Sequence, residues 1–340
     1  MKRTLFALSL GALVALGWGA AANAAGSCRM LQIGELPLAA DGPQVSVEAQ
    51  VNGHPVRMIV DTGSAATLLF RKGAEQLGLP ARALKAVRFY GVGGGDEGAM
   101  AYVSEFKLAN MVMRNFNVIV TGRGSIGGAQ GILGAGFLLQ SDVEFDLPGG
   151  KVRFFKPEGC AGDQVVYWGK AYSVAPMVGD GTRKIAITVK LNGTPVVAQM
   201  DTGTGMSVVT TATAAAVGLK PGAEGVKAAG LITGVGRARV STFVGTFPTF
   251  AFGDETIGNA KLRIADLFHA DTEMQLGSNI PVAAADTPRM LLGADFFRAH
   301  RVYVSRGQRK VYVSYMGGPV FETREAPPPA GAGAAPTPAR

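Results

Sequence analysis

The sequence predicts an all-β protein built from two related halves that pack about a pseudo-two-fold axis. Three observations predict this fold class. Glycine is abundant, with 48 residues among 340, and this level favours tight turns and short strands over long helices. Short apolar runs flank Asn-Gly and Gly-Gly turn signals, as in β-hairpins. The third observation is an internal repeat that covers most of the chain.

The repeat consists of two matching stretches in each half, and the first of them aligns without a gap. A shift of 201 − 61 = 140 residues aligns VEAQVNGHPVRMIVDTGSAATLLF (residues 47–70) with ITVKLNGTPVVAQMDTGTGMSVVT (187–210). A shift of 293 − 134 = 159 aligns residues 132–155 with 291–314, so the second half carries extra residues between its two matches. Repetition on this scale indicates two copies of one unit rather than a solenoid of short repeats.

Each unit is expected to consist of hairpins with short helices. Residues 47–51 and 56–60 flank Asn52-Gly53, a strong hairpin signal that Asn192-Gly193 repeats in the second unit. Two more hairpins are predicted, one at 143–145 with 152–155 and one at 302–304 with 311–313. Short helices are expected at 72–77, 137–140, 212–217 and 296–299.

The two ends of the chain differ from the repeated units. Lys2 and Arg3 precede an apolar run and the small residues Ala22-Asn23-Ala24, a pattern typical of a bacterial signal peptide, with a membrane anchor as the alternative. The protein is therefore expected to be exported, to the periplasm or beyond, with no membrane span after cleavage. The predicted parts are a signal peptide (1–24), a first lobe (25–155), an interlobe connector (156–183), a second lobe (184–316) and a disordered Pro/Ala/Gly-rich tail (317–340).

Composition restricts which disulfides, ligands and cofactors can be expected. The chain has only two cysteines, Cys28 and Cys160, which favours one disulfide in an oxidising compartment, with lipid modification of Cys28 as a rival. The net charge of +8 is scattered, so nucleic-acid binding is not expected. Three isolated histidines and spaced glycines without a βαβ context predict neither a metal site nor a cofactor.

Two Asp-Thr-Gly motifs are the strongest functional signal. Asp61-Thr62-Gly63 follows an apolar strand, and Asp201-Thr202-Gly203 occupies the same place in the second unit. One copy alone is compatible with an Asx-type turn. A buried carboxylate needs a partner, and two copies meeting at the axis would share a proton.

With Ile132-Leu133-Gly134 and Leu291-Leu292-Gly293, these motifs resemble aspartic proteases of the pepsin and retropepsin superfamily, across nearly all of residues 47–315. Each half is close to a retropepsin subunit in length, as in fused retropepsin-like units of exported bacterial proteins. The resemblance implies a bilobal all-β monomer, an internal pseudo-dimer. It also implies an endopeptidase in which Asp61 and Asp201 activate water. The alternative is a non-catalytic peptide-binding module that kept the fold.

The resemblance also implies supporting roles. Thr62 and Thr202 would hydrogen-bond across the lobe interface, while Gly63 and Gly203 would allow close approach of the backbone. The remaining supporting residues are Ser64 and Thr204. Their hydroxyls are expected to donate to the neighbouring carboxylates, which would lower the pKa of the pair and favour an acidic pH optimum.

Glycine-rich stretches thirty residues after each motif are predicted to be flaps. FYGVGGG contains Tyr90, Gly91 and Gly93, with Tyr90 in the flap-tyrosine role, and ITGVG contains Gly234 and Gly236. A peptide or protein substrate would bind as an added strand between the flaps and the Asp61–Asp201 pair, here called the dyad. The insert at 259–289 could line or block this groove. Four other aspartates are expected at the surface or in turns: Asp142, Asp146, Asp254 and Asp295.

Overall fold

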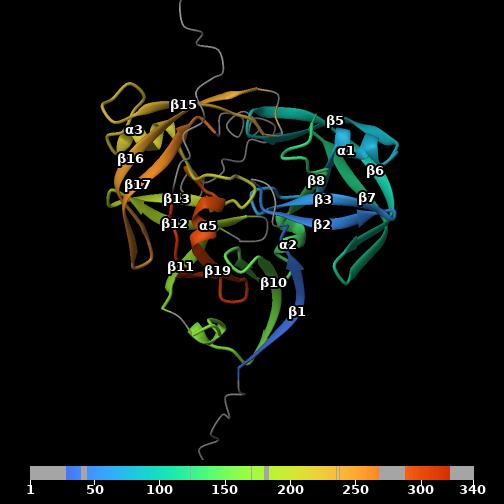
Figure 1. The fold of residues 1–340 in the computed structure, drawn as a ribbon, viewed down its shortest axis with the longest axis horizontal. Helices are drawn as coiled ribbons and strands as arrows, with labels where there is room; N and C mark the ends of the chain where they lie inside the picture. The colour runs from blue at the N-terminus through green and yellow to red at the C-terminus, as the bar shows by residue number, and fades with distance from the viewer. Residues whose placement is uncertain are drawn as a thin grey trace, which may run out of the picture.

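The computed structural model describes residues 28–39, 44–122, 124–169, 171–179, 184–234, 236, 238–267 and 288–321, with backbone alone for Ala86 and Val87. The predicted signal peptide, most of the predicted tail and residues 268–287 of the insert lie outside these ranges. The chain forms two β lobes, side by side, that share a central sheet (Figure 1). The predicted all-β bilobal fold is confirmed. No helix in the described ranges has the length and apolar character needed to cross a membrane.

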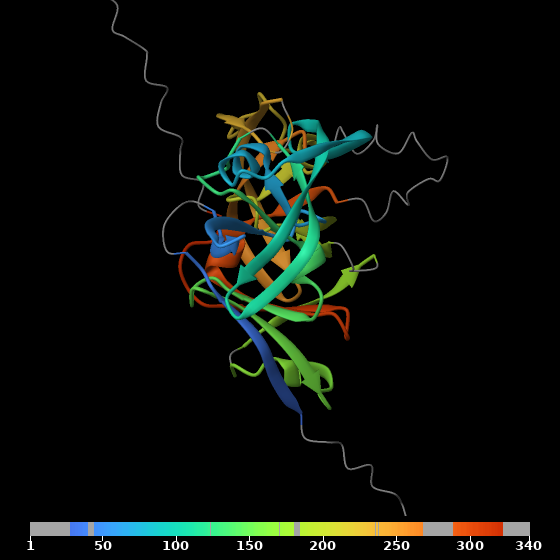
Figure 2. The same ribbon diagram turned by 90° about the vertical axis from the view of Figure 1, so that its right-hand side faces the viewer.

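The first lobe is a closed barrel of six strands with a seventh attached. The barrel order is β2-β3-β8-β4-β7-β6, closed by pairing between β2 and β6, and β5 pairs with the outer side of β6. Its elements are β2 (Ser46–Val51), β3 (His54–Asp61), β4 (Leu68–Phe70), α1 (Arg71–Gln76), β5 (Ala81–Gly91), β6 (Gly94–Leu108), β7 (Met111–Thr121), β8 (Gly131–Gly134) and α2 (Ala135–Leu138). Figure 2 faces this lobe.

The second lobe repeats the same order. Its barrel is β12-β13-β18-β14-β17-β16, closed by pairing between β12 and β16, with β15 attached to β16. The elements are β12 (Ile185–Leu191), β13 (Thr194–Met200), β14 (Val208–Thr210), α3 (Thr211–Ala216), β15 (Lys227–Ile232), β16 (Val240–Phe252), β17 (Glu255–Ala265), β18 (Met290–Leu292) and α5 (Ala294–Ala299). The repeat in the sequence is therefore a repeat of whole barrels.

Local sequence accounts for the barrel geometry. Asn52 and Gly53 have φ of 50° and 81°, and Asn192 and Gly193 have 49° and 81°, so the β2–β3 and β12–β13 hairpins close through the left-handed region that Asn-Gly favours. Alternate residues of β2 and β12 point into the barrels. The helices α2 and α5 begin two residues earlier than predicted, at Ala135 and Ala294, directly after the glycine of each Leu-Gly motif.

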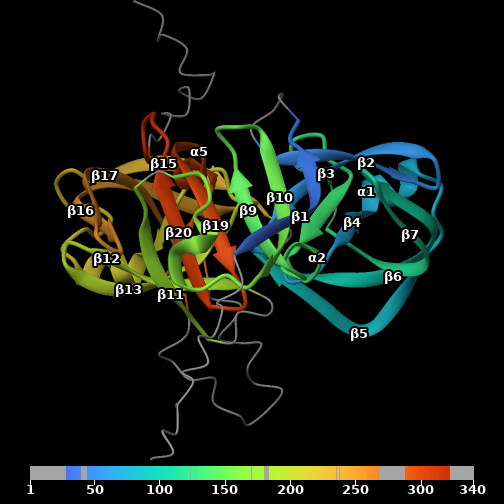
Figure 3. The same cartoon turned by 90° about the horizontal axis from the view of Figure 1, so that it is seen from below.

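A six-stranded antiparallel sheet joins the lobes and closes the molecule from below (Figure 3). Its order is β1 (Arg29–Pro37), β10 (Lys151–Glu158), β9 (Asp142–Asp146), β19 (His300–Ser305), β20 (Lys310–Tyr315) and β11 (Ser173–Val178). The predicted connector therefore contributes β11 to this sheet and also contains a 3-10 turn, η1 (Gly162–Val165). Pairing of β9 with β19 brings Phe145 of the first half opposite Val302 of the second.

Buried charges hold β9 against β19. Glu144 is fully buried and accepts hydrogen bonds from Arg153 and, at 3.1 Å, from Arg301. Asp146 accepts from Arg153 at 3.0 Å. Asp142 accepts from the hydroxyl of Tyr303 at 3.0 Å. Both aspartates are buried, so the expectation of a surface or turn position is wrong for Asp142, whose partner Tyr303 comes from a strand that is distant in the sequence. Asp146 is not at the surface either, but it does belong to a turn, because it accepts from the N–H of Gly149 at 3.0 Å.

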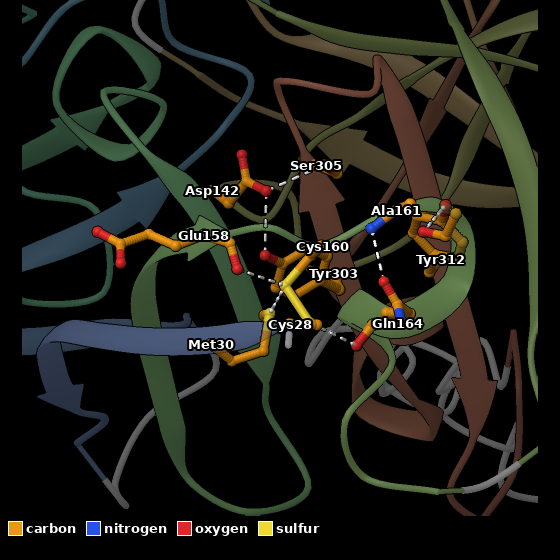
Figure 4. The surroundings of a disulfide bond; sticks show 11 residues. Cys28, Met30, Asp142, Glu158, Cys160, Ala161, Gln164, Tyr303, Ser305 and Tyr312 are labelled. Carbon is orange, nitrogen blue, oxygen red and sulfur yellow. Dashed lines mark hydrogen bonds between the residues drawn. A yellow bond between two sulfur atoms is a disulfide. The ribbon is translucent and has the colours of Figure 1, made fainter. Parts of the chain in front are cut away.

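The structure joins Cys28 and Cys160 in a disulfide, the pairing favoured by the cysteine count. The bond links the start of β1 to the residues after β10, with Cα atoms 4.3 Å apart (Figure 4). It closes the end of the β1–β10 ladder, in which Arg29 lies opposite Glu158. This end of the molecule is opposite the β5 and β15 hairpins (Figure 1).

We predict that Cys28→Ser together with Cys160→Ser lowers the free energy of unfolding by about 2–4 kcal/mol, because the bond closes a long loop in the unfolded chain. The sequence separation is 132 residues. Urea denaturation of the oxidised protein, the reduced protein and the double variant would measure the loss of stability. Equal midpoints for all three would contradict this role.

Candidate active site

The two barrels present one aspartate each at their interface. Asp61 is the last residue of β3, and Asp201 directly follows β13. β3 runs parallel to β8, with Asp61 opposite Gly134, and β13 runs parallel to β18, with Met200 opposite Leu292. The Leu-Gly motifs therefore lie beside the Asp-Thr-Gly loops and fix where each strand ends.

Two buried threonines lock the loops together. The N–H of Thr62 donates to Oγ1 of Thr202, and the N–H of Thr202 donates to Oγ1 of Thr62, both at 3.1 Å. Each hydroxyl in turn donates across the interface, Thr62 to the carbonyl of Met200 at 2.8 Å and Thr202 to that of Val60 at 2.7 Å. The four bonds are symmetric, and together they set the separation of the lobes at the site.

Each glycine of the motif faces the carboxylate of the other lobe. A Cβ placed on Gly63 would lie 2.3 Å from Cγ of Asp201, and one on Gly203 would lie 2.2 Å from Cγ of Asp61. No side chain fits there, so glycine is required for this approach. The structure thus brings Asp61 and Asp201 together, within hydrogen-bonding reach of each other.

Backbone amides hold one oxygen of each carboxylate. Oδ1 of Asp61 accepts from the N–H groups of Gly63 and Ser64, at 2.8 and 3.0 Å. Oδ1 of Asp201 accepts from those of Gly203 and Thr204, at 2.9 and 3.2 Å. The backbone of each Asp-Thr-Gly loop and of the residue after it therefore orients the carboxylate of that loop.

The expected role of the Ser64 and Thr204 hydroxyls is wrong. Ser64 Oγ donates to the carbonyl of Ala66 at 2.9 Å, and Thr204 Oγ1 donates to that of Met206 at 3.2 Å. A hydroxyl has one proton to donate, so neither donates to a carboxylate. The two residues support the carboxylates through their backbone N–H groups, and their hydroxyls shape the loops that follow.

Burial raises the pKa of both carboxyls, although each residue keeps partial exposure. For Asp201 the negative charge of Asp61 and their shared hydrogen bond raise the pKa further. For Asp61 the hydrogen bond from Asp201 and the amides of Ser64 and Gly63 lower it part of the way back. This arrangement favours one proton shared by the pair, and the two groups titrate as a unit.

The sequence did not lead us to expect one hydrogen bond behind each aspartate loop, here called a brace, in which a side-chain hydroxyl accepts from the glycine of the Leu-Gly motif. Ser207 Oγ accepts from the N–H of Gly293 at 2.9 Å, and in the first lobe Thr67 Oγ1 accepts from that of Gly134 at 3.2 Å. The 140-residue shift aligns Thr67 with Ser207, so the repeat held this signal.

Asp295 is buried, and the expectation that it lies at the surface or in a turn is wrong. It accepts hydrogen bonds from the N–H of Ser207 at 2.8 Å and from the Ser207 hydroxyl at 2.7 Å. The first lobe has no equivalent carboxylate, because Gly136 stands at that place. Gln199 is a second unpredicted contact, donating across the interface to the carbonyl of Gly63 at 3.2 Å.

The two glycine-rich stretches contact each other across the two lobes. In the first lobe β5 turns into β6 through Val92 and Gly93, and the second stretch joins β15 to β16. The N–H of Gly236 donates to the carbonyl of Val92 at 3.1 Å, and that of Ala238 to the carbonyl of Gly93 at 2.9 Å. Gly93 has a φ of 87°, and an added Cβ would lie 2.3 Å from the Ala238 oxygen.

The remaining residues predicted to belong to flaps lie within these hairpins. Tyr90 is opposite Gly95 and Gly91 is opposite Gly94. The Tyr90 side chain is 37% exposed, and its ring packs against Gly95. A Cβ on Gly234 would lie 2.7 Å from the carbonyl oxygen of Val92, so Gly234 also contacts the first hairpin. Val235 of the second stretch lies outside the described residues. A flap-tyrosine role for Tyr90 stays a prediction.

No cluster of three or more metal-binding side chains occurs in the part of the chain that the structure describes. A family model described as "Aspartyl protease" matches residues 47–137 and again residues 187–296, together more than half of the chain. The chain therefore belongs to the aspartyl protease family, and the two matches correspond to two fused retropepsin-like units. A comparison with curated proteins found no match.

Asp201→Asn is expected to stabilise the protein at neutral pH by about 1–3 kcal/mol, because it removes one of two buried, facing carboxyls. Both carboxyls have a pKa raised by folding. Such groups stabilise the fold at low pH, and this contribution is lost as pH rises through the folded-state pKa. The gain should therefore shrink towards pH 4. Thermal unfolding from pH 4 to 8 measures it, with exposed Glu75→Gln as control. A gain independent of pH would contradict the raised pKa values.

Thr202→Val is expected to lower the free energy of unfolding by about 1–3 kcal/mol and to reduce activity. Valine matches threonine in shape but removes a donor to Val60 and an acceptor for Thr62. Thr202→Ser keeps both and is the matched control. Equal urea midpoints for the valine and serine variants would show that the cross-lobe bonds are dispensable.

Proposed function

We propose that the protein is an aspartic endopeptidase in which Asp61 and Asp201 share one proton and activate a water molecule. The observation that carries the proposal is the mutual packing of the two loops, with each carboxylate against the opposite glycine. Two carboxyls confined in this way cannot both ionise cheaply. One is then available as a base and the other as an acid.

The chemistry follows from this single proton. The ionised member of the pair takes a proton from water while the water oxygen attacks the carbonyl carbon of the peptide. The protonated member gives its proton to the carbonyl oxygen, which forms a tetrahedral diol. When the diol collapses, the proton taken from water passes from the dyad to the nitrogen and the C–N bond breaks. A diol hydroxyl returns its proton to the dyad as the carbonyl of the product forms, so the pair again holds one proton.

The flaps support an extended substrate. Their tips are joined by the hydrogen bonds of Gly236 and Ala238, so they must separate before a peptide enters. Once inside, a peptide in strand conformation can pair with flap backbone, while its side chains alternate between the two lobes. Action after export to an oxidising compartment is part of the proposal, and the Cys28–Cys160 disulfide supports it.

The direct test is digestion of an unstructured protein between pH 3 and 8. Wild-type protein should cleave it with a bell-shaped pH dependence, since the one-proton state is lost at both extremes. Asp61→Asn and Asp201→Asn should each reduce the rate by about 100-fold or more, while exposed Glu75→Gln should not. A statine-type inhibitor should block cleavage.

Cleavage that survives in both asparagine variants would overturn the dyad. Peptide binding without cleavage by the wild type would instead identify a binding module that has kept the protease fold.

A further inference from the structure

Arg263 in β17 is a buried cation without a carboxylate partner in the described part of the chain. Its side chain is 5% exposed. Nη1 donates to Thr242 Oγ1 at 2.6 Å and to the carbonyl of Ala229 at 2.9 Å. Nη2 reaches only Sδ of Met206, at 3.6 Å, and Nε has no partner. The edge formed by Nε and Nη2 is thus left with one weak sulfur acceptor.

The fold itself does not require a cation at this place. β14 pairs with β17 as β4 pairs with β7, so Val208 opposite Arg263 corresponds to Leu68 opposite Ile119. In the first lobe Ile119 packs in an apolar cluster with Leu68 and Ile132. Burial lowers the pKa of Arg263, which reflects the cost of holding the charge there. An isoleucine would avoid that cost.

The guanidinium lies close to the second aspartate loop. Met206 follows two residues after Thr204, whose N–H holds Asp201, and the backbone of Arg263 donates to the carbonyl of Ser207. Its other two partners, Ala229 and Thr242, belong to the two strands of the second flap. Arg263 therefore lies between the second aspartate loop and the base of the second flap.

A cluster of buried apolar residues adjoins this position. It consists of Val208, Ala265, Leu267 and Leu291, with Ile232 and Val240 of the second flap and Val92 from the tip of the first. The cluster combines residues of both flaps with strand β14, beside Arg263. A peptide side chain that entered the second lobe from beneath the flap tips would contact this cluster, with Arg263 beside it.

We propose that Arg263 is a specificity-determining residue that binds the carboxylate of an aspartate or glutamate side chain in the substrate. The free Nε–Nη2 edge has the geometry that accepts both oxygens of one carboxylate. Met206 covers this edge, and its unbranched, flexible side chain can move aside. The inference rests on the proposed peptidase function and names a substrate class for it: peptides with an acidic residue at one position that faces the second lobe.

The test is cleavage-site profiling of a peptide library by mass spectrometry, followed by kinetics on matched Glu and Gln peptides. Wild-type protein should enrich Asp and Glu at one position, with kcat/KM about 10- to 100-fold higher for the Glu peptide. Arg263→Met should lose the preference, so that its kcat/KM values for the Glu and Gln peptides lie within about 3-fold of each other. Arg263→Lys should keep part of the preference for the Glu peptide. Exposed Arg114→Met, on the equivalent strand β7, is the control and should change nothing.

The outcomes separate the two proposals. Cleavage without an acidic preference in the wild type overturns the role of Arg263 and leaves the peptidase intact, even if Arg263→Met does not fold. A preference for acidic residues that survives in Arg263→Met also overturns the role of Arg263. Failure of the wild type to cleave any peptide overturns the peptidase, and this inference with it.

Discussion

The structure depends on the four hydrogen bonds that Thr62 and Thr202 make across the lobe interface. They are buried, symmetric and directly adjacent to the two aspartates in the sequence. Because each threonine holds the backbone of the opposite lobe, Asp61 and Asp201 cannot move independently. The approach of each glycine to the opposite carboxylate, and the raised pKa values that follow from burial, are consequences of this lock. The central sheet adds a second, larger connection below it.

Two copies of one unit have kept the lock and diverged around it. The threonine pair, the amide bonds to each carboxylate and the Thr67 and Ser207 braces are repeated almost without change. Arg263 occupies the position in the second lobe that Ile119 occupies in the first, so this position is charged in the second lobe only. A fused chain permits such asymmetry, since each lobe can specialise for its own side of a substrate while the dyad stays symmetric.

The fold and the dyad could be predicted from the sequence because both depend on local signals that occur twice. Asn52-Gly53 and Asn192-Gly193 fix hairpins by their own conformational preference, and the paired aspartates gain meaning from the repeat. Side-chain partners that come from distant strands could not be predicted. Burial of Asp142 depends on Tyr303 across the β9–β19 pairing. The hydroxyls of Ser64 and Thr204 turned to nearby carbonyls, a choice of rotamer that sequence does not encode.

The central claim is that Asp61 and Asp201 hold one proton between them. Carbon-13 NMR titration of the aspartate carboxyls, in the wild type and in Asp61→Asn, tests it most directly. A shared proton should give two coupled titration steps for the pair in the wild type. In Asp61→Asn a single step is expected for Asp201, with a lower pKa than in the wild type because the neighbouring charge is gone. Two carboxyls that titrate independently, each with the ordinary pKa of an aspartate, would contradict it.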